Sequence, residues 1–159
     1  MGTRTSKPRR TVVLMVSAIL ALGIAFAPAA QAGSGFRSKV LRMVNATRNN
    51  HGLHTLRIDR SLSRDALRHT RRMISDNAIY DPTNLTGILQ DEPWDTVGAS
   101  AVGCADTLSA LHNAFMHDPV HRAILLNSKT RRIGIGVIEV DSQNTCGRNW
   151  LWATELFYG

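Results

Sequence analysis

Apolar residues recur at helical spacing through the first half of the chain. The sequence predicts a helix over Gly33–Asn50, with Ser34 as its N-cap and Gly52 as the left-handed residue that ends it. Its apolar stripe consists of Phe36, Val40, Leu41 and Val44. A second helix is predicted to begin near Asp59 or Ser61. The residues that repeat about every fourth position on its apolar face are Leu62, Ala66, Thr70 and Met73.

A third helix is predicted over Asp106–Met116, and a fourth follows it almost directly. Asp118 is a good N-cap because its carboxylate can accept hydrogen bonds from free N–H groups of the next turn. Pro119 suits the first helical position, where its missing N–H is not needed. This count places His121 in the first turn. There the positive end of the helix dipole favours a neutral ring that can accept a proton or bind a ligand.

The remaining segments differ from this helical pattern. Residues from Asn77 to Gly103 are rich in Pro, Asn, Asp and Gly, which predicts loops, with Trp94 as an anchor to the core. The last part predicts two strands, because Arg132–Val140 alternates and Asn149–Tyr158 is rich in β-branched and aromatic residues. The connection between these two strands is polar and turn-like.

The N-terminal segment has the layout of a secretory signal. Four basic residues precede an uncharged apolar run, and Ala30-Gln31-Ala32 forms a small-x-small cleavage pattern. The sequence therefore predicts a signal peptide over 1–32, a single domain over 33–159 and a secreted, extracellular protein. An uncleaved anchor stays open, although the apolar run is short for a membrane span. After cleavage we expect no stable membrane span and a monomer.

The charge changes once this segment is set aside. The signal holds four of the 19 basic residues and none of the 12 acidic ones, so the net charge falls from +7 to +3. A local asymmetry remains, since ten basic and two acidic residues lie between Arg37 and Arg72. Such runs are usually solvated helix faces. No aromatic residues interleave with the arginines, so we expect no specific binding of nucleic acid.

Cys104 and Cys146 are the only cysteines of the chain. In an exported protein they most simply form one disulfide, between the loop before the third helix and the turn that joins the last strands. Two independent buried thiols are the alternative.

Several short motifs, taken in order, resemble the CAP superfamily of cysteine-rich secretory, antigen 5 and pathogenesis-related proteins, also called SCP domains. The resemblance spans about Phe36–Phe157 and is closest to short bacterial secreted members. The motifs are Asn45-x-x-Arg48, Gly52-Leu53-x-x-Leu56, Asp59-x-x-Leu62, Ala66-x-x-His69-x-x-x-Met73, Val97-Gly98, Phe115-Met116-x-Asp118-Pro119-x-His121-Arg122, Ile133-Gly134-Ile135-Gly136-Val137 and Trp152-x-Thr154-x-x-Phe157. The resemblance implies an α+β fold: an α-β-α sandwich with a small antiparallel sheet between helical layers.

The resemblance also implies a cleft built from two histidines and acidic partners. Here the cleft is degenerate, because Tyr80-Asp81 stands in place of a histidine motif and Gly98-Ala99-Ser100 in place of Gly-Glu-Asn. His121 survives, with Asp118 near a second acidic position. A tight zinc site needs three or four donors, so we expect no metal and no cofactor. We also find no Gly-x-Ser-x-Gly nucleophile motif.

Three functional hypotheses follow. The first is a non-catalytic CAP-domain protein that binds a small apolar or peptide-like ligand, or a cell-surface component. Its cleft would be lined by Tyr80, Asp81, Ala99, Ser100, Asp118 and His121. The second is a hydrolase or peptidase that uses His121 as a base with Asp118 or Asp81. The degenerate cleft disfavours this hypothesis. The third is an adhesion module that acts through the basic face Arg60–Arg72.

Overall fold

A computed structural model describes residues 30–93 and 97–159 of the protein, with the backbone alone for 30–34. Most of the predicted signal segment, and the predicted anchor Trp94, lie outside the described residues. Across the two described ranges, none of the helices combines the length and the apolar character that crossing a bilayer requires.

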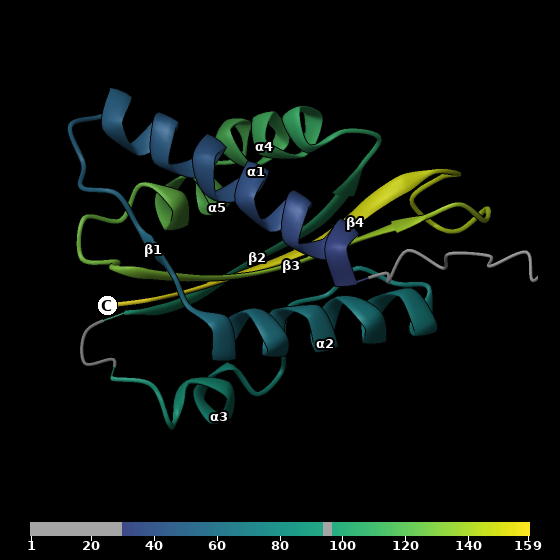
Figure 1. Ribbon diagram of the computed structural model, residues 1–159, viewed down its shortest axis with the longest axis horizontal. Helices are drawn as coiled ribbons and strands as arrows, with labels where there is room; N and C mark the ends of the chain where they lie inside the picture. The colour runs from purple at the N-terminus through teal and green to yellow at the C-terminus, as the bar shows by residue number, and fades with distance from the viewer. Residues whose placement is uncertain (1–29, 94–96) are drawn as a thin grey trace, which may run out of the picture.

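The described chain forms three layers (Figure 1). The elements are α1 (Ala30–Asn50), β1 (Arg57–Ile58), α2 (Arg60–Asp76), α3 (Leu85–Leu89), β2 (Gly98–Ala105), α4 (Leu108–His117), α5 (Pro119–Leu125), β3 (Arg132–Val140) and β4 (Trp150–Tyr158). Helices α1, α4 and α5 cover one face of the sheet, and α2 and α3 cover the other. The predicted α-β-α sandwich is confirmed.

The sheet has the strand order β1-β3-β4-β2. Strands β3, β4 and β2 pair antiparallel, whereas the two-residue strand β1 pairs parallel with β3. The three long strands form the expected antiparallel sheet, and the short strand β1 makes the sheet mixed at this edge. The parallel pair arises because β1 lies in the short connection between α1 and α2, which carries the chain across the end of the sheet.

The helix boundaries follow the sequence signals closely. Asp59 caps α2 by accepting from the backbone N–H of Leu62 at 3.0 Å, and the left-handed Asn77 ends the helix. Gly52 takes the expected positive φ of 69° after α1. The prediction of Ser34 as an N-cap is wrong, because α1 begins at Ala30 and Ser34 lies within it.

Helix α2 packs directly on the backbone of β3. Both Gly134 and Gly136 of β3 face this helix. A Cβ atom on Gly136 would lie 2.3 Å from the backbone nitrogen of Leu67, and one on Gly134 would lie 2.5 Å from the carbonyl carbon of Leu62. Because these positions carry no side chain, the helix can approach the strand closely enough to bury Leu62, Ala66 and Met73.

The expectation of loops from Asn77 to Gly103 is wrong at two places, which are α3 and the edge strand β2. The sequence of β2, Gly-Ala-Ser-Ala-Val-Gly-Cys-Ala, has one β-branched residue, Val102, and no aromatic one, so it lacks the composition that normally indicates a strand. Its small residues give room for the helices above it. A Cβ atom on Gly103 would lie 3.0 Å from the ring of Phe115.

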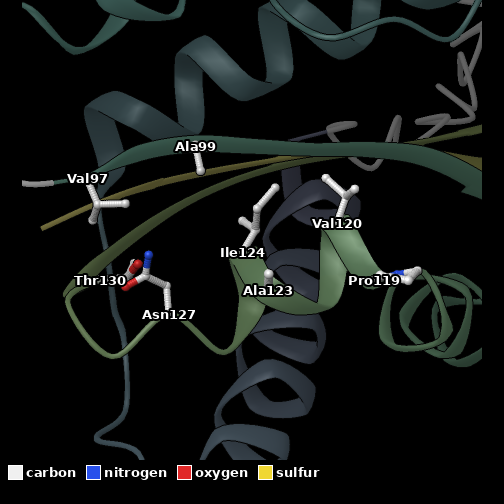
Figure 2. A pocket seen from close by; sticks show the side chains of 8 residues that line it. All are labelled: Val97, Ala99, Pro119, Val120, Ala123, Ile124, Asn127 and Thr130. Carbon is white, nitrogen blue, oxygen red and sulfur yellow. The ribbon is translucent and has the colours of Figure 1, made fainter.

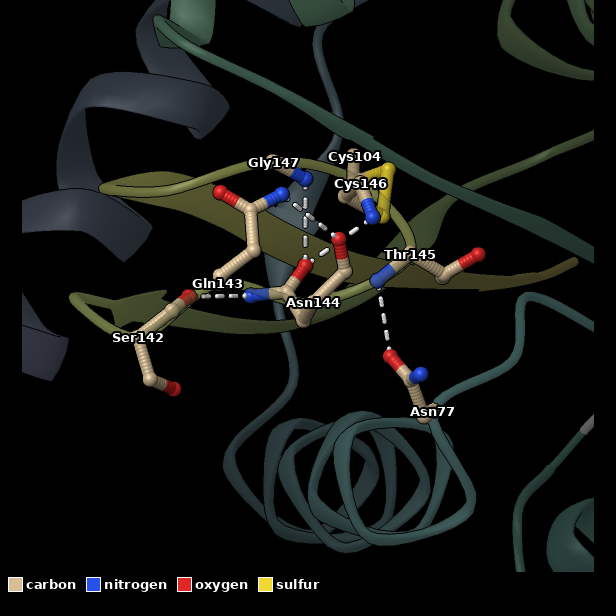
Figure 3. The surroundings of a disulfide bond; sticks show 8 residues. All are labelled: Asn77, Cys104, Ser142, Gln143, Asn144, Thr145, Cys146 and Gly147. Carbon is tan, nitrogen blue, oxygen red and sulfur yellow. Dashed lines mark hydrogen bonds between the residues drawn. A yellow bond between two sulfur atoms is a disulfide. The ribbon is translucent and has the colours of Figure 1, made fainter.

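The predicted disulfide between Cys104 and Cys146 is present, with a Cα–Cα distance of 6.1 Å (Figure 3). Cys104 lies in strand β2, so its predicted place in a loop is wrong. Next to the bond, Asn144 accepts from the backbone of Cys146 at 2.9 Å, and Asn77 accepts from Thr145 at 2.8 Å. Closing a loop of 42 residues contributes about 3–5 kcal/mol in the chain-entropy model.

Candidate functional site

The first turn of α5 is held by its N-cap, as the sequence predicts. The Asp118 carboxylate accepts hydrogen bonds from the backbone N–H groups of Val120 at 3.0 Å and His121 at 2.9 Å. Pro119 occupies the first helical position. Chiefly because of the hydrogen bond from the His121 backbone, the pKa of the Asp118 carboxyl lies below its usual value.

The imidazole of His121 is oriented from two sides. Its Nδ1 lies 3.0 Å from Oδ1 of Asp118, and its ring stacks on Phe115 with 4.8 Å between ring centroids. The side chain keeps 28% of its surface exposed. With Nδ1 directed at the carboxylate, a neutral ring presents Nε2 as an acceptor. The protonation state of His121 stays a prediction.

A groove of about 480 Å³ lies between α5 and the beginning of β2 (Figure 2). Figure 2 shows Ile124 and Val120 of α5 pointing toward the strand that carries Ala99. The residues that line the groove are Val97, Ala99, Pro119, Val120, Ala123, Ile124, Asn127 and Thr130. Six of these eight are apolar, and Val120 is 68% exposed. Removal of such surface from water is favourable, so the groove suits an apolar group.

One polar atom at the groove lacks a protein partner. The hydroxyl of Thr130 is buried, and among the described residues its Oγ1 has no hydrogen-bond partner. A buried hydroxyl without a partner is unfavourable by about 1–3 kcal/mol.

The structure brings only part of the predicted cleft together. Ala99 lines the groove beside the first turn of α5, which carries Asp118 and His121. On the other face of the sheet, Ser100 donates to Oδ1 of Asp81 at 2.8 Å. Tyr80 also lies there and packs edge-on against His69 with 5.2 Å between ring centroids.

Strand geometry explains this division. Successive residues of a strand point to opposite faces, so Ala99 and Ser100 cannot share a site. Ala99 is opposite Phe157, which belongs to the core under α1 and α4, and Ser100 is opposite Leu156, which packs against α2. The sequence does not reveal that Ala99 and Ser100 lie on opposite faces, because it predicts a loop where β2 begins.

Three other histidines, at positions 69, 112 and 117, have structural surroundings. His69 is buried and hydrogen-bonds the carbonyl of Tyr80 at 2.8 Å, and His112 lies 2.7 Å from Oγ1 of Thr47. Burial lowers the pKa of His112. His117 hydrogen-bonds the carbonyl of Asn113. In the part of the chain that the structure describes, no three His, Cys, Asp or Glu side chains are grouped so that they could hold a metal ion.

The basic face Arg60–Arg72 is exposed, and neighbouring acidic residues balance part of its positive charge. Its arginines are Arg60, Arg64, Arg68, Arg71 and Arg72, and all five are exposed. Asp65 forms an ion pair with Arg68. Asp91 and Glu92 line the same surface hollow as Arg64 and Arg71.

Sequence reasoning missed most of the groove. The sequence does not predict a site that includes Val97, Val120, Ala123 and Thr130. The available signal is a valine in the predicted first turn of a helix, because Val120 follows Pro119 directly and has no place in the predicted core.

The chain has a helical layer on each face of a sheet, and His121 lies in the capped first turn of α5. This arrangement is that of a CAP-type domain. Residues 41–156 match the Cysteine-rich secretory protein family, and the chain belongs to this family. It is 29% identical over 119 residues to an uncharacterized protein of Bacillus subtilis, YkwD, over 69% of this chain and 45% of that protein. The chain therefore spans less than half the length of that relative.

Solved structures show the same fold. A cysteine-rich secretory protein of Staphylococcus aureus aligns with a TM-score of 0.65 at 23% identity, over 83% of this chain and 40% of that one. An outer surface protein of Borrelia burgdorferi aligns with a TM-score of 0.64 at 18% identity, over 77% of this chain and 90% of that one. An extracellular protein with an SCP domain from Bacillus anthracis gives 0.63 at 19% identity, over 81% and 42%.

Proposed function

We propose that this protein is an extracellular, non-catalytic CAP-domain protein that binds a small apolar or peptide-like ligand in the groove between α5 and β2. The observation that carries the proposal is the apolar lining of that groove, with Val120 left 68% exposed on its wall. A large exposed apolar side chain on a concave surface is typical of a binding site. Thr130, whose buried hydroxyl has no hydrogen-bond partner among the described residues, also lines the groove.

Action outside the cell is supported by two independent features. The disulfide between Cys104 and Cys146 suits an oxidising compartment, and the first 32 residues have the layout of a secretory signal. The solved structures of the same fold include an extracellular protein and an outer surface protein.

Val120→Glu is expected to weaken the binding of an uncharged apolar probe, Nile red, by about tenfold, which corresponds to about 1.4 kcal/mol. The carboxylate would place charge on the apolar wall, while a glutamate in the first turn suits the helix dipole and keeps α5 folded. Fluorescence titration of the secreted protein measures the dissociation constant.

Ile79→Glu is the matched control, because Ile79 is, among the described residues, the other large apolar side chain that is exposed, and it does not line the groove. Its affinity for Nile red is expected to equal that of the wild type. Equal binding by wild type and Val120→Glu, or no binding by the wild type, would refute the groove as the ligand site.

Hydrolysis is the second candidate, and the pair formed by His121 and Asp118 favours it. The Asp118 carboxylate lies 3.0 Å from Nδ1 of His121 and orients the imidazole. A histidine that acts as a general base usually needs such a partner. On this hypothesis His121→Ala lowers turnover of an ester or peptide substrate by about 10²–10⁴-fold without lowering Tm. His117→Ala is the control, because His117 is exposed on the preceding helix. No turnover by the wild type, or an equal loss in both variants, contradicts the hydrolase.

A further inference from the structure

A second concave surface lies at the β1 edge of the sheet. It has a volume of about 430 Å³, and its lining residues are His54, Thr55, Arg57, Arg131 and Arg132. Arg57 and Arg132 are partners in the register of the parallel pair, so their backbones lie side by side across β1 and β3. Arg131 is next to Arg132 in the chain. Three arginines therefore line one pocket, from two strands and the turn before β3.

The pocket is partly ordered by hydrogen bonds. Nη1 of Arg131 donates to the carbonyl of Ser128 at 2.7 Å and lies 2.6 Å from Nε2 of His54. Nε2 of His54 lies 2.6 Å from the carbonyl of Thr130. These contacts hold the Arg131 side chain at the pocket before any ligand arrives. A group that is already in place loses less conformational entropy on binding.

No acidic side chain balances this charge. Among the described residues, none of the guanidinium groups of Arg57, Arg131 and Arg132 has an Asp or Glu oxygen within 4.0 Å. Like charges held together without a counter-charge repel one another, so a bound anion would be favoured at this edge.

The positive charge extends below the surface. Arg48 is fully buried, and its guanidinium donates to the carbonyls of His54, Leu125 and Asn127 at 2.7–3.0 Å. Burial, together with repulsion from Arg131, lowers the pKa of Arg48. A buried cation neutralised only by carbonyl dipoles increases the positive potential beneath the pocket.

The arginines of α2 differ from this cluster in an important way. Asp65, Asp91 and Glu92 lie among them, and Arg68 is already ion-paired. Their number is larger, but their charge is distributed along an exposed helix face. The β1 edge has fewer arginines, and these form a pocket with no acidic lining residue.

We propose that the pocket of Arg57, Arg131 and Arg132 binds a phosphate group, carried by a soluble anion or by a lipid headgroup. The guanidinium fork matches phosphate oxygens in pairs. Inorganic phosphate or a phosphate monoester carries about −1.5 to −2 charge at neutral pH, so it balances more of this charge than a single carboxylate would. The phosphodiester of a lipid headgroup such as phosphatidylglycerol carries one negative charge and still offers a pair of oxygens to a guanidinium fork.

The test is a titration of the folded, secreted protein with inorganic phosphate at pH 7.5 and constant ionic strength, followed through the NMR signals of the arginine side chains. A second arm measures binding to vesicles with and without phosphatidylglycerol. Sodium acetate is the control anion.

The double variant Arg57→Gln/Arg132→Gln is expected to bind phosphate at least about tenfold more weakly, because it removes two of the three guanidinium groups. Arg71→Gln is the matched control for loss of positive charge and is expected to bind within about twofold of the wild type.

Saturable binding of inorganic phosphate that the double variant loses supports the site with a soluble anion as ligand. Binding only to vesicles with phosphatidylglycerol, again lost in the double variant, supports it with a lipid headgroup as the source. Binding of acetate as tight as phosphate, an equal loss in Arg71→Gln, or no binding in either arm overturns the proposal. The single variant Arg57→Gln, at an exposed position, repeats the test if circular dichroism shows that the double variant is unfolded.

Discussion

Glu155→Gln is expected to raise the free energy of unfolding at pH 7 by about 3 kcal/mol. Glu155 lies in the middle of β4, between Ala101 and Ile135 of the neighbouring strands, and is 2% exposed. Its Oε2 has no hydrogen-bond partner among the described residues. Burial raises the pKa of this carboxyl to about 8. The folded protein therefore holds a proton that the unfolded chain, with a pKa near 4.5, releases at neutral pH.

The sign of the pH dependence follows from this difference. Between pH 4.5 and 8 the folded state binds more protons at Glu155 than the unfolded state does, so stability falls as the pH rises. The stability contribution of the protonated carboxyl is complete below pH 4.5 and lost above about pH 8. Glutamine is uncharged at every pH and removes this slope, which amounts to about 1.4 kcal/mol per pH unit.

Urea unfolding of wild type and variant from pH 4.5 to 8 measures the effect as a growing difference between two curves. Glu139→Gln, which changes an exposed glutamate on β3, is the control and is expected to stay within about 0.5 kcal/mol of the wild type. A difference between wild type and Glu155→Gln that is constant over this range would contradict the raised pKa.

Gly136→Ala is expected to lower the free energy of unfolding by about 3 kcal/mol or more. The added Cβ would lie 2.3–2.5 Å from three backbone atoms of Ala66 and Leu67 in α2. Backbone atoms within a helix cannot rotate away as a flexible side chain can. The whole helix must therefore move off β3, and the contacts that bury Leu62 and Met73 loosen. Chemical denaturation with far-UV circular dichroism measures the loss.

Gly35→Ala is the matched control for this substitution. Gly35 lies within α1, and nothing lies within 4 Å of the position of its Cβ. Alanine favours a helix over glycine by about 1 kcal/mol, so this variant is expected to be as stable as the wild type or more stable. If Gly136→Ala were also neutral, the close approach of α2 to β3 would not be needed for stability.

Local signals in the sequence were sufficient to predict the main helices and the last two strands. Asp59 and Asp118 cap helices through their own side chains, and the bonds they make involve residues two or three positions away. Arg132–Val140 forms a strand with the predicted boundaries because its alternation of apolar residues is itself a local pattern. Such features depend on neighbours in the chain, so they can be read without a fold.

The candidate site could be predicted only in part, for a related reason. His121 and Asp118 are three residues apart on one turn, and their contact was foreseeable from that spacing. The groove was not, because it needs β2 beside α5. Residues in β2 are small and resemble loop residues until the partner strand β4 is present to supply hydrogen bonds.

Local sequence patterns were enough to predict the helices α1, α2, α4 and α5, the caps Asp59 and Asp118, the two C-terminal strands and a single pair of cysteines that could join. Which face of β2 each side chain occupies depends on the pairing of β2 with β4, which separates Ala99 from Ser100 and forms the groove with Val120. Tertiary contacts also place Arg57 of β1 beside Arg132 of β3, and they bury Glu155 of β4, whose Oε2 has no hydrogen-bond partner among the described residues. The physical reason is that helix caps and strand alternation are set by near neighbours, whereas burial and the convergence of charges depend on residues distant in the chain.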